Sequence, residues 1–411
     1  MKKIVLILLS IMVIQLSAQT ITNYTTADGL LDNFVECIDV DLNDNVWLGT
    51  SNGVQMFDGS SLAIFNILNY PGMLSDNIKC IKATSNGEIW VGTDYGANQL
   101  ISGVSGFMWL NYTTSNGLIS NQVKSIDEDP NGGIWIGTNQ GVSYFDGNSW
   151  TSYSSPDLHW SGVNTTAFDS NGDKWFTSPL AGITHFDGIT FTNYNTSNGL
   201  LSQNVTSLLI DNQDNKWIGT DLGMSVLNTS NTSFFDHIEM YSLPPPHDSI
   251  NPVVDIAMDS YERIWTAIYV GYLAEGGIAY WNGSQWEDFH VSDGLAGPNV
   301  RGLAIDSQDN VWVATSTGVS KISSPPSSSS NIFHFTTEVY PNPTLGKFYI
   351  NAESENFNTI AVYNNLGSLV YFKSLKCQQK IEIDFPSFTK GLHHISLQSD
   401  KGVENHKILI Q

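Results

Sequence analysis

The chain contains few positive charges. Its 411 residues include 17 Lys and Arg against 40 Asp and Glu, which gives a formal net charge of −23. Residues 19–330 alone contain 8 cationic and 33 acidic residues. Because phosphates are neutralised by clusters of Lys and Arg, this composition excludes nucleic acid as a partner and argues against an anionic membrane surface. We interpret the acidity as a solubility feature of an exported protein, with cation binding as the less favoured alternative.

Residues that carry common enzyme chemistry are also scarce. Arginine occurs only at Arg263 and Arg301, so the arginine triad with which sialidases hold a carboxylate substrate cannot form. The chain has no Cys/His cluster at zinc spacing, no G-x-S-x-G motif and no phosphate-binding glycine loop. We therefore expect no cofactor, no metal site and no catalytic residues.

Long apolar runs are confined to the N-terminus. Lys2 and Lys3 precede an apolar run from Ile4 to Leu16, and the small residues Ser17 and Ala18 follow. This pattern predicts a secretory signal peptide that is cleaved before residue 19. A membrane anchor is the alternative, but the run is shorter than the ~20 residues that a span needs. We expect an exported mature chain with no transmembrane segment.

A repeat fills most of the chain. The segment Asn116–Gly147, with the sequence NGLISNQVKSIDEDPNGGIWIGTNQGVSYFDG, recurs in near-copies. Each copy contains one tryptophan at the same place, and successive tryptophans lie 43, 45, 40, 42, 48 and 47 residues apart. The seven are Trp47, Trp90, Trp135, Trp175, Trp217, Trp265 and Trp312. Such a fixed period indicates a repeat architecture.

Each part of the repeat predicts a short strand or a turn. Alternating apolar residues such as Ile38 and Val40 predict a half-buried strand. Six of the seven copies have an Asp six residues before the tryptophan and then a polar turn, whereas the second copy has Thr84. The tryptophan strand ends in Gly-Thr in four copies, and two further strands follow. The Asp-rich turns lack the spacing of a calcium loop, so we interpret them as hairpin turns.

Repeats of ~40–45 residues with four short strands are typical of propeller blades. The copies resemble the two-component regulator propeller family, whose blade reads D-x-x-G-x-x-W-x-G-T-x-x-G-v-x-x-f, most closely at 129–142 and 41–54. The resemblance covers Tyr24 to Ile322. The fourth and sixth copies depart from it: the tryptophan is followed by Phe-Thr-Ser at Trp175 and by Thr-Ala-Ile at Trp265, without the Gly-Thr. The predicted fold class is all-β, with a seven-bladed β-propeller.

The N-terminal strand is predicted to close the ring. Residues Ile21–Thr26 match the fourth-strand position of the other copies, while the seventh copy stops at Ile322 after its third strand. A strand supplied by the N-terminus would leave no open sheet edge where the first and last repeats meet. Cys37 and Cys80 occupy the same position of neighbouring copies, and we expect them to be small buried side chains rather than a disulfide.

A second, smaller domain follows the repeats. The Ser/Pro segment SSPPSSSS at 323–330 predicts a linker, and the alternating strands and turns after it predict a small Ig-like β-sandwich. This sandwich resembles the type A C-terminal sorting domain of the Bacteroidetes type IX secretion system through Tyr340–Pro343, Tyr363–Gly367 and Gly391–Ile395. His393 stands where that family usually has tyrosine. The resemblance implies passage through the outer membrane, followed by removal of the domain or attachment at the surface.

These observations predict four parts of the chain: a signal peptide at 1–18, a propeller at 19–322, a linker at 323–332 and a sorting domain at 333–411.

Two departures from the repeat coincide in the sixth copy. The distance from the tryptophan to the loop glycine is six residues in five copies, but twelve between Trp265 and Gly277. The segment that leads into the same copy, Ser242–Pro252, has the divergent sequence SLPPPHDSINP. Loops after second strands and before first strands emerge on one face of a propeller, around the mouth of its channel. We therefore predict a binding site there, on the inserted residues Tyr269, Tyr272 and Glu275.

A third departure lies in the loop that leads into the fourth copy. His159 and Trp160 replace apolar and small residues there, and a tryptophan at a loop tip can stack on a sugar ring. The alternative is a loop that packs on its own blade. Asp94, Tyr95 and Asp221 occupy matching loop positions in the second and fifth copies and complete the predicted ligand-binding set.

The sequence thus favours an exported or cell-surface ligand-binding propeller. The family resemblance implies a sensor-like role, in gut Bacteroidetes often for oligosaccharides, with a glycan or small molecule as ligand and the secretion machinery as partner. Two alternatives remain open. One is a module for protein–protein interaction or adhesion. The other is an enzyme like the streptogramin lyases, which are also seven-bladed propellers, although no histidine of this chain stands at a repeat-regular inner position.

Overall fold

The computed structural model describes residues 20–323, apart from 104–105, 160–161, 243–250 and 272, and residues 337–410, apart from 341, 343, 345–346, 353–356, 365–368, 376–379, 385–389 and 400–401. The predicted signal peptide and residues 324–332 of the predicted linker lie outside the described residues. No helix in the described ranges is long and apolar enough to cross a membrane.

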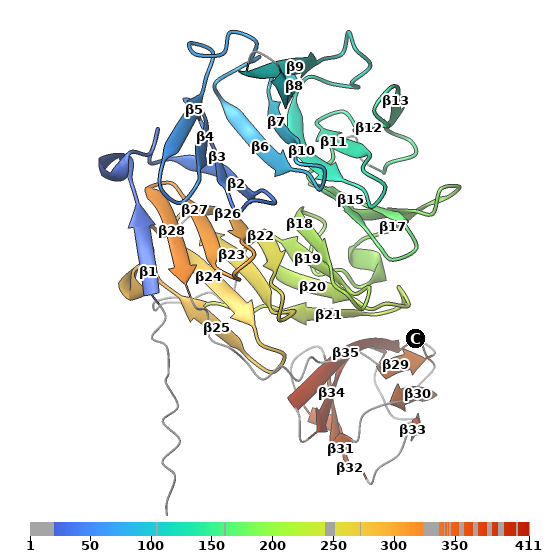
Figure 1. The fold of residues 1–411 in the computed structure, drawn as a ribbon. Helices are drawn as coiled ribbons and strands as arrows, with labels where there is room; N and C mark the ends of the chain where they lie inside the picture. The colour runs from blue at the N-terminus through green and yellow to red at the C-terminus, as the bar shows by residue number, and fades with distance from the viewer. Residues whose placement is uncertain are drawn as a thin grey trace, which may run out of the picture.

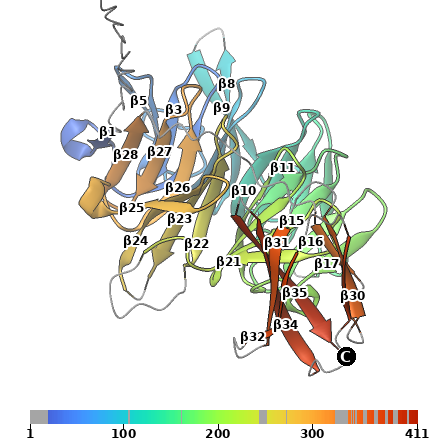
Figure 2. The same cartoon turned by 90° about the horizontal axis from the view of Figure 1, so that it is seen from below.

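Seven four-stranded antiparallel sheets form a ring, and this confirms the predicted propeller (Figures 1 and 2). Blade one consists of β2 (Val35–Val40), β3 (Val46–Thr50), β4 (Gly53–Phe57) and β5 (Leu62–Phe65). Blade two consists of β6 (Ile78–Ala83), β7 (Ile89–Thr93), β8 (Gly96–Gly103) and β9 (Gly106–Tyr112). Blade three consists of β10 (Val123–Glu128), β11 (Ile134–Thr138), β12 (Val142–Phe145) and β13 (Trp150–Tyr153).

Blade four consists of β14 (Thr166–Phe168), β15 (Lys174–Ser178), β16 (Gly182–Phe186) and β17 (Phe191–Tyr194). Blade five consists of β18 (Val205–Ile210), β19 (Lys216–Thr220), β20 (Gly223–Leu227) and β21 (Phe234–His237). Blade six consists of β22 (Val253–Met258), β23 (Ile264–Val270), β24 (Glu275–Trp281) and β25 (Trp286–Phe289). Blade seven combines β26 (Val300–Ile305), β27 (Val311–Thr315) and β28 (Gly318–Ser323) with β1 (Thr20–Tyr24). Three 3-10 turns follow fourth strands: η1 (Thr26–Asp28), η2 (Thr196–Asn198) and η3 (Val291–Asp293).

The ring closes through β1, as the repeat pattern predicts. β1 pairs antiparallel with β28 along its whole length, from Thr20 opposite Ser323 to Tyr24 opposite Val319. The paired strand is thus Thr20–Tyr24, whereas the rest of the predicted segment, Thr25 onward, caps and begins η1. The first and last repeats are therefore joined by backbone hydrogen bonds, which removes the open sheet edge.

A buried hydrogen bond fixes the tryptophan of each blade. In blade one, Asp41 accepts the backbone N–H groups of Asn43 and Asn45 through Oδ1 and the indole N–H of Trp47 through Oδ2, at 2.8–3.0 Å. In each of blades three to seven, the equivalent Asp accepts a hydrogen bond from the indole N–H of its tryptophan in the same way. The Asp-rich segments are therefore hairpin turns, as predicted. Each carboxylate fixes the turn and the orientation of the ring together.

Blade two reaches the same arrangement with different residues. Thr84 stands in the Asp position, and its hydroxyl donates to the Glu88 carbonyl and accepts the Glu88 N–H, both at 2.9 Å. The indole N–H of Trp90 then donates to the Glu88 carboxylate at 3.1 Å. The acid has moved four residues along the turn, but the tryptophan keeps a carboxylate partner.

The Gly-Thr pair of the second strand lets neighbouring blades approach closely. A Cβ atom on Gly49 would lie 2.4 Å from the Cys37 sulfur and 2.7 Å from Ile78 of the next blade. Thr50 donates its hydroxyl to the Gly53 carbonyl at 2.9 Å and so closes the following loop. Cys37 and its counterpart Cys80 are free thiols that pack on these glycines, as expected. Burial raises the pKa of both thiols.

Acidic turn residues also link one blade to the next. Asp44, which adopts a left-handed φ of 61°, accepts the backbone N–H of Ser307 from blade seven at 2.8 Å and its hydroxyl at 2.7 Å. Equivalent serine-to-acid contacts connect blades two and three, four and five, and six and seven. Much of the acidic composition thus belongs to the turns on the face opposite the channel mouth, and the interpretation as a solubility feature alone was incomplete.

Three carboxylates satisfy backbone groups on the channel-facing edges of the first strands. Each accepts a backbone N–H from the next blade at 2.9 Å: Ala83 donates to Asp39, Thr166 to Asp127 and Leu303 to Asp255. The Lys82 ammonium lies 3.3 Å from the Asp39 carboxylate. Burial raises the pKa of Asp127 and of Asp255 to about 6, against the lowering effect of these hydrogen bonds.

The C-terminal unit is a β-sandwich with its own core. One sheet contains β29 (Thr337–Tyr340), β30 (Lys347–Ala352) and β33 (Lys380–Asp384), and the other contains β31 (Phe357–Asn364), β32 (Leu369–Ser374), β34 (Gly391–Ser399) and β35 (Gly402–Ile410). Buried residues of both sheets, including Phe348, Ile381 and Ile395, form one cluster. His393 is buried in β34, so the departure from tyrosine is accommodated inside the strand.

Removal of β1 tests the closure. Deleting residues 1–24 should lower the Tm strongly or cause aggregation, because β28 becomes an unpaired edge and the Tyr24 ring leaves its contacts with Phe57 and Trp312. A chain that lacks only residues 1–19 is the matched control. If both truncated chains melt at the same temperature, β1 does not close the ring.

The channel carboxyls predict a pH dependence of stability. Folding raises the pKa of Asp127 and of Asp255 from about 3.9 to about 6, so the folded state binds more protons between these values and gains stability as the pH falls. Between pH 7.5 and 5.0 each carboxyl contributes about 1 kcal/mol. Asp255→Asn, which keeps an acceptor for the Leu303 N–H, should raise the Tm at pH 7.5 and reduce the increase on acidification.

Asp58→Asn is the control for this measurement. Asp58 is exposed, and hydrogen bonds from Ser61 and Ser60 hold its pKa well below its usual range, so it titrates below pH 5.0. The control should show the full increase in Tm between pH 7.5 and 5.0. An equal increase in Asp255→Asn and wild type would contradict the assignment of the titration to the channel.

Candidate ligand site at the channel mouth

Seven residues that each lie four positions after a blade tryptophan surround the channel mouth, six of them in loops and Tyr269 in β23. They are Ser51, Asp94, Asn139, Pro179, Asp221, Tyr269 and Ser316. In four blades the backbone N–H of this residue donates to the carbonyl just before the first strand, at 3.0–3.3 Å. These bonds involve Asn139, Asp221, Tyr269 and Ser316. The loops are therefore held in place by the backbone, and Tyr269 is the one aromatic residue among the seven.

The insertion in blade six lengthens a hairpin. β23 and β24 continue beyond the usual end of the second strand, with Tyr269 opposite Gly276 and Val270 opposite Glu275. Leu273 and Ala274 close the turn by donating their N–H groups to Val270 and Gly271. The inserted residues thus extend the sheet of the blade.

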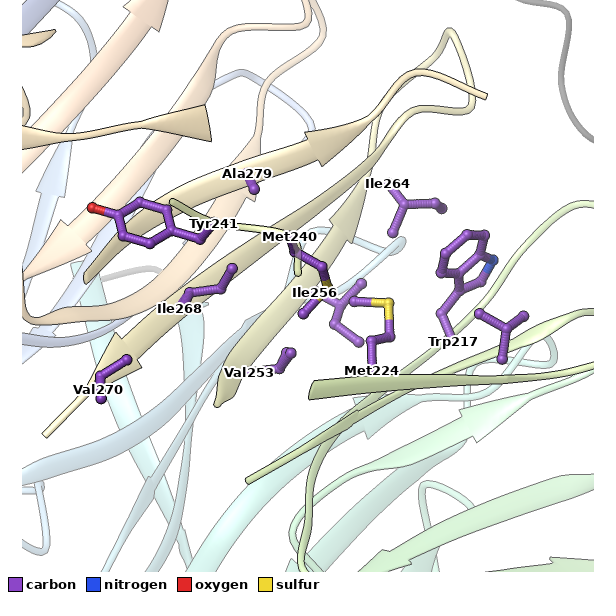
Figure 3. Close-up of a cluster of buried hydrophobic side chains, with 11 residues drawn as sticks. Trp217, Met224, Met240, Tyr241, Val253, Ile256, Ile264, Ile268, Val270 and Ala279 are labelled. Atoms are coloured by element: carbon purple, nitrogen blue, oxygen red, sulfur yellow. The ribbon is translucent and has the colours of Figure 1, made fainter. Parts of the chain in front are cut away.

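Tyr269 and Glu275 lie on opposite faces of this hairpin. Directly opposed residues share a face and neighbours along a strand alternate, so Tyr269 shares the face of Trp265 and Ala267, which pack toward blade seven. Val270 shares the other face with Ile268, in the cluster that includes Met240 and Tyr241 (Figure 3). Glu275 belongs to that second face because it pairs with Val270.

Met240 and Tyr241, which precede the divergent segment Ser242–Pro252, pack on the face of Glu275, while residues 243–250 of that segment lie outside the described residues. Tyr241 donates its hydroxyl to the Gly276 carbonyl at 2.7 Å, and its ring lies 4.4 Å from the His290 ring. Burial, followed by the negative charges of Asp288 and Glu275, raises the pKa of Tyr241. Tyr241 is thus a structural support of the hairpin, and the sequence analysis did not identify it because it lies just before the divergent segment.

The other predicted residues are spread over several loops. Asp94 lies 3.6 Å from the Lys79 ammonium, and Asp221 accepts from the Asn204 amide at 3.2 Å. Tyr95 is 64% exposed. His159 is exposed, whereas its neighbour Leu158 is buried and holds the loop on its blade. Trp160 and Tyr272 lie outside the described residues.

The structure adds charged residues that the loop comparison missed. Eleven residues before the tryptophan, the first strands present Glu36, Lys79, Lys124 and Arg301 beside the mouth. The Arg301 guanidinium binds Glu36 across blades seven and one at 2.6 Å, and the Lys124 ammonium donates to Asn164 of the next blade at 3.3 Å. Comparison of the seven copies at this position would have identified these residues from the sequence.

Two buried acceptors at the mouth have no protein donor among the described residues. They are Oδ1 of Asp221 and Oδ1 of Asn299. Asn299 precedes β26, and its backbone carbonyl accepts the Ser316 N–H. A buried acceptor without a partner costs about 1–3 kcal/mol, so both atoms are available to accept a hydrogen bond from water or from a ligand.

One group of side chains has the composition of a metal site. Ligand atoms of Asp169, Asp173 and His185 lie within 4.8 Å of one another in blade four. Asp169 already accepts two backbone N–H groups and the Trp175 indole, and His185 pairs with Asp173 at 3.0 Å. The Lys216 ammonium lies over the Trp175 ring, 4.8 Å from its centroid. The carboxylates and the imidazole are therefore already engaged in protein contacts, and the Lys216 ammonium places a positive charge nearby. We interpret the group as part of the blade structure and not as a metal site.

The described histidines of blades four and five do not face the mouth. His185 belongs to the Asp169 group just described. His237 is stacked on Trp217 and accepts from the Trp286 indole at 3.0 Å, and burial lowers its pKa to about 3. A neutral, buried imidazole of this kind is a packing residue.

Family models match both parts of the chain. The model described as two component regulator propeller matches residues 72–95, 117–140 and 294–317. The model described as secretion system C-terminal sorting domain matches residues 338–411. No curated protein matches the chain at a significant level.

Solved structures share the fold at low identity. A protein described as the extracellular domain of a hybrid two component system, BT3049 from B. thetaiotaomicron, is 16% identical with a TM-score of 0.62, over 95% of this chain and 57% of that one. PorZ, a surface component of the type IX secretion system of Porphyromonas gingivalis, is 17% identical with a TM-score of 0.57, over 92% of this chain and 60% of that one. The chain thus spans less than two thirds of either protein.

An enzyme also shares the propeller. Virginiamycin B lyase from Staphylococcus aureus is 16% identical with a TM-score of 0.58, over 74% of this chain and 98% of that one. At these identities the similarities establish the fold alone. The family matches add the identity of the two parts: the chain carries two-component regulator propeller repeats and a C-terminal sorting domain of the type IX secretion system, which directs export to the cell surface or the medium.

Proposed function

We propose that this surface propeller binds a hydroxyl-rich small molecule, such as an oligosaccharide, at the channel mouth. The observation that carries the proposal is the pair of buried acceptors, Oδ1 of Asp221 and Oδ1 of Asn299, on loops that the backbone already holds in place. A hydroxyl can donate to such an acceptor without bringing a charge. Sites of this kind are usually formed before the ligand arrives.

The other groups at the mouth suit the same ligand. Tyr269, at the seam between blades six and seven, supplies an aromatic surface against which a sugar ring can lie. Lys79 and Lys124 supply donors, and Asp94 supplies an acceptor. Since cations and acids are paired here, the mouth has no large charge of one sign, which favours a neutral polar ligand.

Glu275 takes a different role in this proposal. Because it lies on the face of the hairpin opposite Tyr269, one small ligand does not contact both side chains. We assign Tyr269, Asp94 and Asp221 to the ligand and Glu275 to the support of the hairpin. Tyr95 and His159 are outer contacts for a longer oligosaccharide.

A lyase activity is the less favoured function. It needs a histidine and an acid placed together at the mouth, and His185 and His237 are engaged elsewhere in their blades. Two described histidines lie on loops of the mouth face. His159 is exposed, whereas His290 lies 3.4 Å from the Asp288 carboxylate, the Ser242 hydroxyl contacts both groups, and the Tyr241 ring packs on the imidazole. These contacts assign the His290–Asp288 pair to the support of its loop. The proposal therefore contains no catalytic step.

Substitution of Tyr269 tests the site. Soluble oligosaccharides are first screened against the full chain by thermal shift, and the Kd of any hit is measured by calorimetry. Tyr269→Ala should weaken binding about 5–10-fold, because an aromatic contact contributes about 0.5–1.5 kcal/mol beyond its area. Tyr261→Ala, in the turn of the same blade that precedes β23, is the control and should bind like wild type. Equal affinity in both variants would contradict the placement at the mouth.

Deletion of the sorting domain tests delivery separately. A chain that lacks residues 338–411 retains all seven blades and should stay folded, but it should accumulate in the periplasm. Cell fractionation and protease access to intact cells measure this. The full-length Tyr269→Ala variant is the control and should reach the surface or the medium. Surface exposure of the truncated chain would contradict the role of the domain.

A further inference from the structure

A cavity of about 320 Å³ lies at the seam between blade seven and blade one. Its inner walls are aromatic and aliphatic, and polar groups occur at its edge. The lining consists of Thr22, Asn23, Tyr24, Asp28, Leu30, Val46, Leu48, Phe57, Ser60, Leu62, Trp312 and Val319. This volume is at the lower end of the range for small-molecule sites, and the mixture of apolar walls and a few polar groups is typical of them.

The same framework of aromatic rings occurs at the seam between blades two and three. Tyr24 and Phe57 have ring centroids 5.2 Å apart, and their counterparts Tyr112 and Phe145 are 5.3 Å apart. Trp312 lies 6.0 Å from Phe57, and Trp90 lies 6.1 Å from Phe145. The two seams therefore place three equivalent rings in nearly the same arrangement.

The two seams differ in the residue that fills the space between these rings. Trp150, which starts the fourth strand of blade three, stacks on Phe145 with the ring centroids 4.7 Å apart and the ring planes at 24°. Its ring centroid also lies 5.6 Å from that of Tyr112. The equivalent residue of blade one, opposite Phe57, is Leu62. Blades two to six all have an aromatic residue at this position: Trp109, Trp150, Phe191, Phe234 and Trp286. At the seam of blade one an aliphatic side chain stands in the place of a ring.

From this comparison we infer that the seam between blades seven and one is a binding site for a planar aromatic molecule of about the size of indole. The ligand takes the place that the Trp150 indole occupies between blades two and three. It stacks on Phe57 and contacts Tyr24 and Trp312, since offset-stacked and edge-to-face arrangements at 4.5–7 Å are favourable for aromatic rings.

A hydroxyl in the cavity selects for a polar atom on the ring. Tyr112 donates its hydroxyl to Gln99 at 2.8 Å, whereas the Tyr24 hydroxyl has no hydrogen-bond partner among the described residues. Tyr24 can therefore accept from an indole N–H or donate to a ring heteroatom. Asp28 already accepts the Thr25 N–H and hydroxyl within its cap, so it remains at the edge of the site as a support.

Binding at this seam is coupled to closure of the ring. Tyr24 belongs to β1 and Trp312 to β27, while Phe57 and Leu62 belong to blade one, so the ligand contacts both sides of the interface between the first and last blades. A ligand that binds only the closed ring stabilises it according to its concentration and Kd. The site is separate from the channel mouth and does not depend on the function proposed there.

Reciprocal substitutions of Leu62 and Trp150 test the inference. Indole is titrated into the full chain by calorimetry, and the Tm is measured with and without it. Wild type should show saturable binding and an increase in Tm with indole. Leu62→Trp should fill the cavity, raise the Tm of the free protein by a few degrees and weaken indole binding at least tenfold. Trp150→Leu should lower the Tm and gain a second indole site between blades two and three.

Further measurements keep the test decisive. If Leu62→Trp does not fold, Leu62→Phe fills the same space with a smaller ring and should still weaken binding. Cyclohexanol, an apolar ring without π electrons, should bind more weakly than indole to wild type. No indole binding by wild type up to the solubility limit, or equal binding by folded Leu62→Trp and wild type, overturns the inference. Equal affinity for cyclohexanol overturns the preference for an aromatic ligand.

Discussion

The hydrogen bond between a turn carboxylate and the tryptophan of each blade is the constraint on which the propeller depends. One carboxylate accepts the backbone of the turn and the indole N–H together, as Asp41 does for Trp47. Charge-assisted hydrogen bonds of this kind contribute about 1.5–3 kcal/mol, and a buried indole N–H left without a partner costs about 1–3 kcal/mol. Blade two keeps the contact through Glu88 after losing the Asp, so the interaction is preserved even where the sequence is not.

This constraint explains where the charge of the protein is located. Carboxylates serve the turns, the links between blades on the face opposite the mouth and the channel-facing strand edges. Four of the eight cations of the propeller, Lys79, Lys82, Lys124 and Arg301, lie on the first strands around the channel. A chain of strongly negative net charge therefore has a channel mouth in which both signs are present and paired.

The two proposed sites arise where the repeat is free to vary. At the mouth, backbone hydrogen bonds hold the loops of four blades, so the residue type at these positions can vary. At the seam between blades seven and one, β1 from the other end of the chain supplies the fourth strand, and Leu62 stands where blades two to six have an aromatic side chain. The comparisons establish a propeller delivered by a sorting domain, and the ligand chemistry rests on these local features.

The sequence by itself determined the number of blades, the strand order, the closure by β1 and the nature of the C-terminal domain. These properties follow from the spacing of the tryptophans and from local sequence patterns that recur in each repeat. Only the tertiary structure decided that Tyr269 and Glu275 point to opposite faces of one hairpin, because that depends on strand register within the insertion. It also decided that Leu62 leaves a cavity, since the walls of that cavity come from residues nearly 300 positions apart, which no local pattern relates.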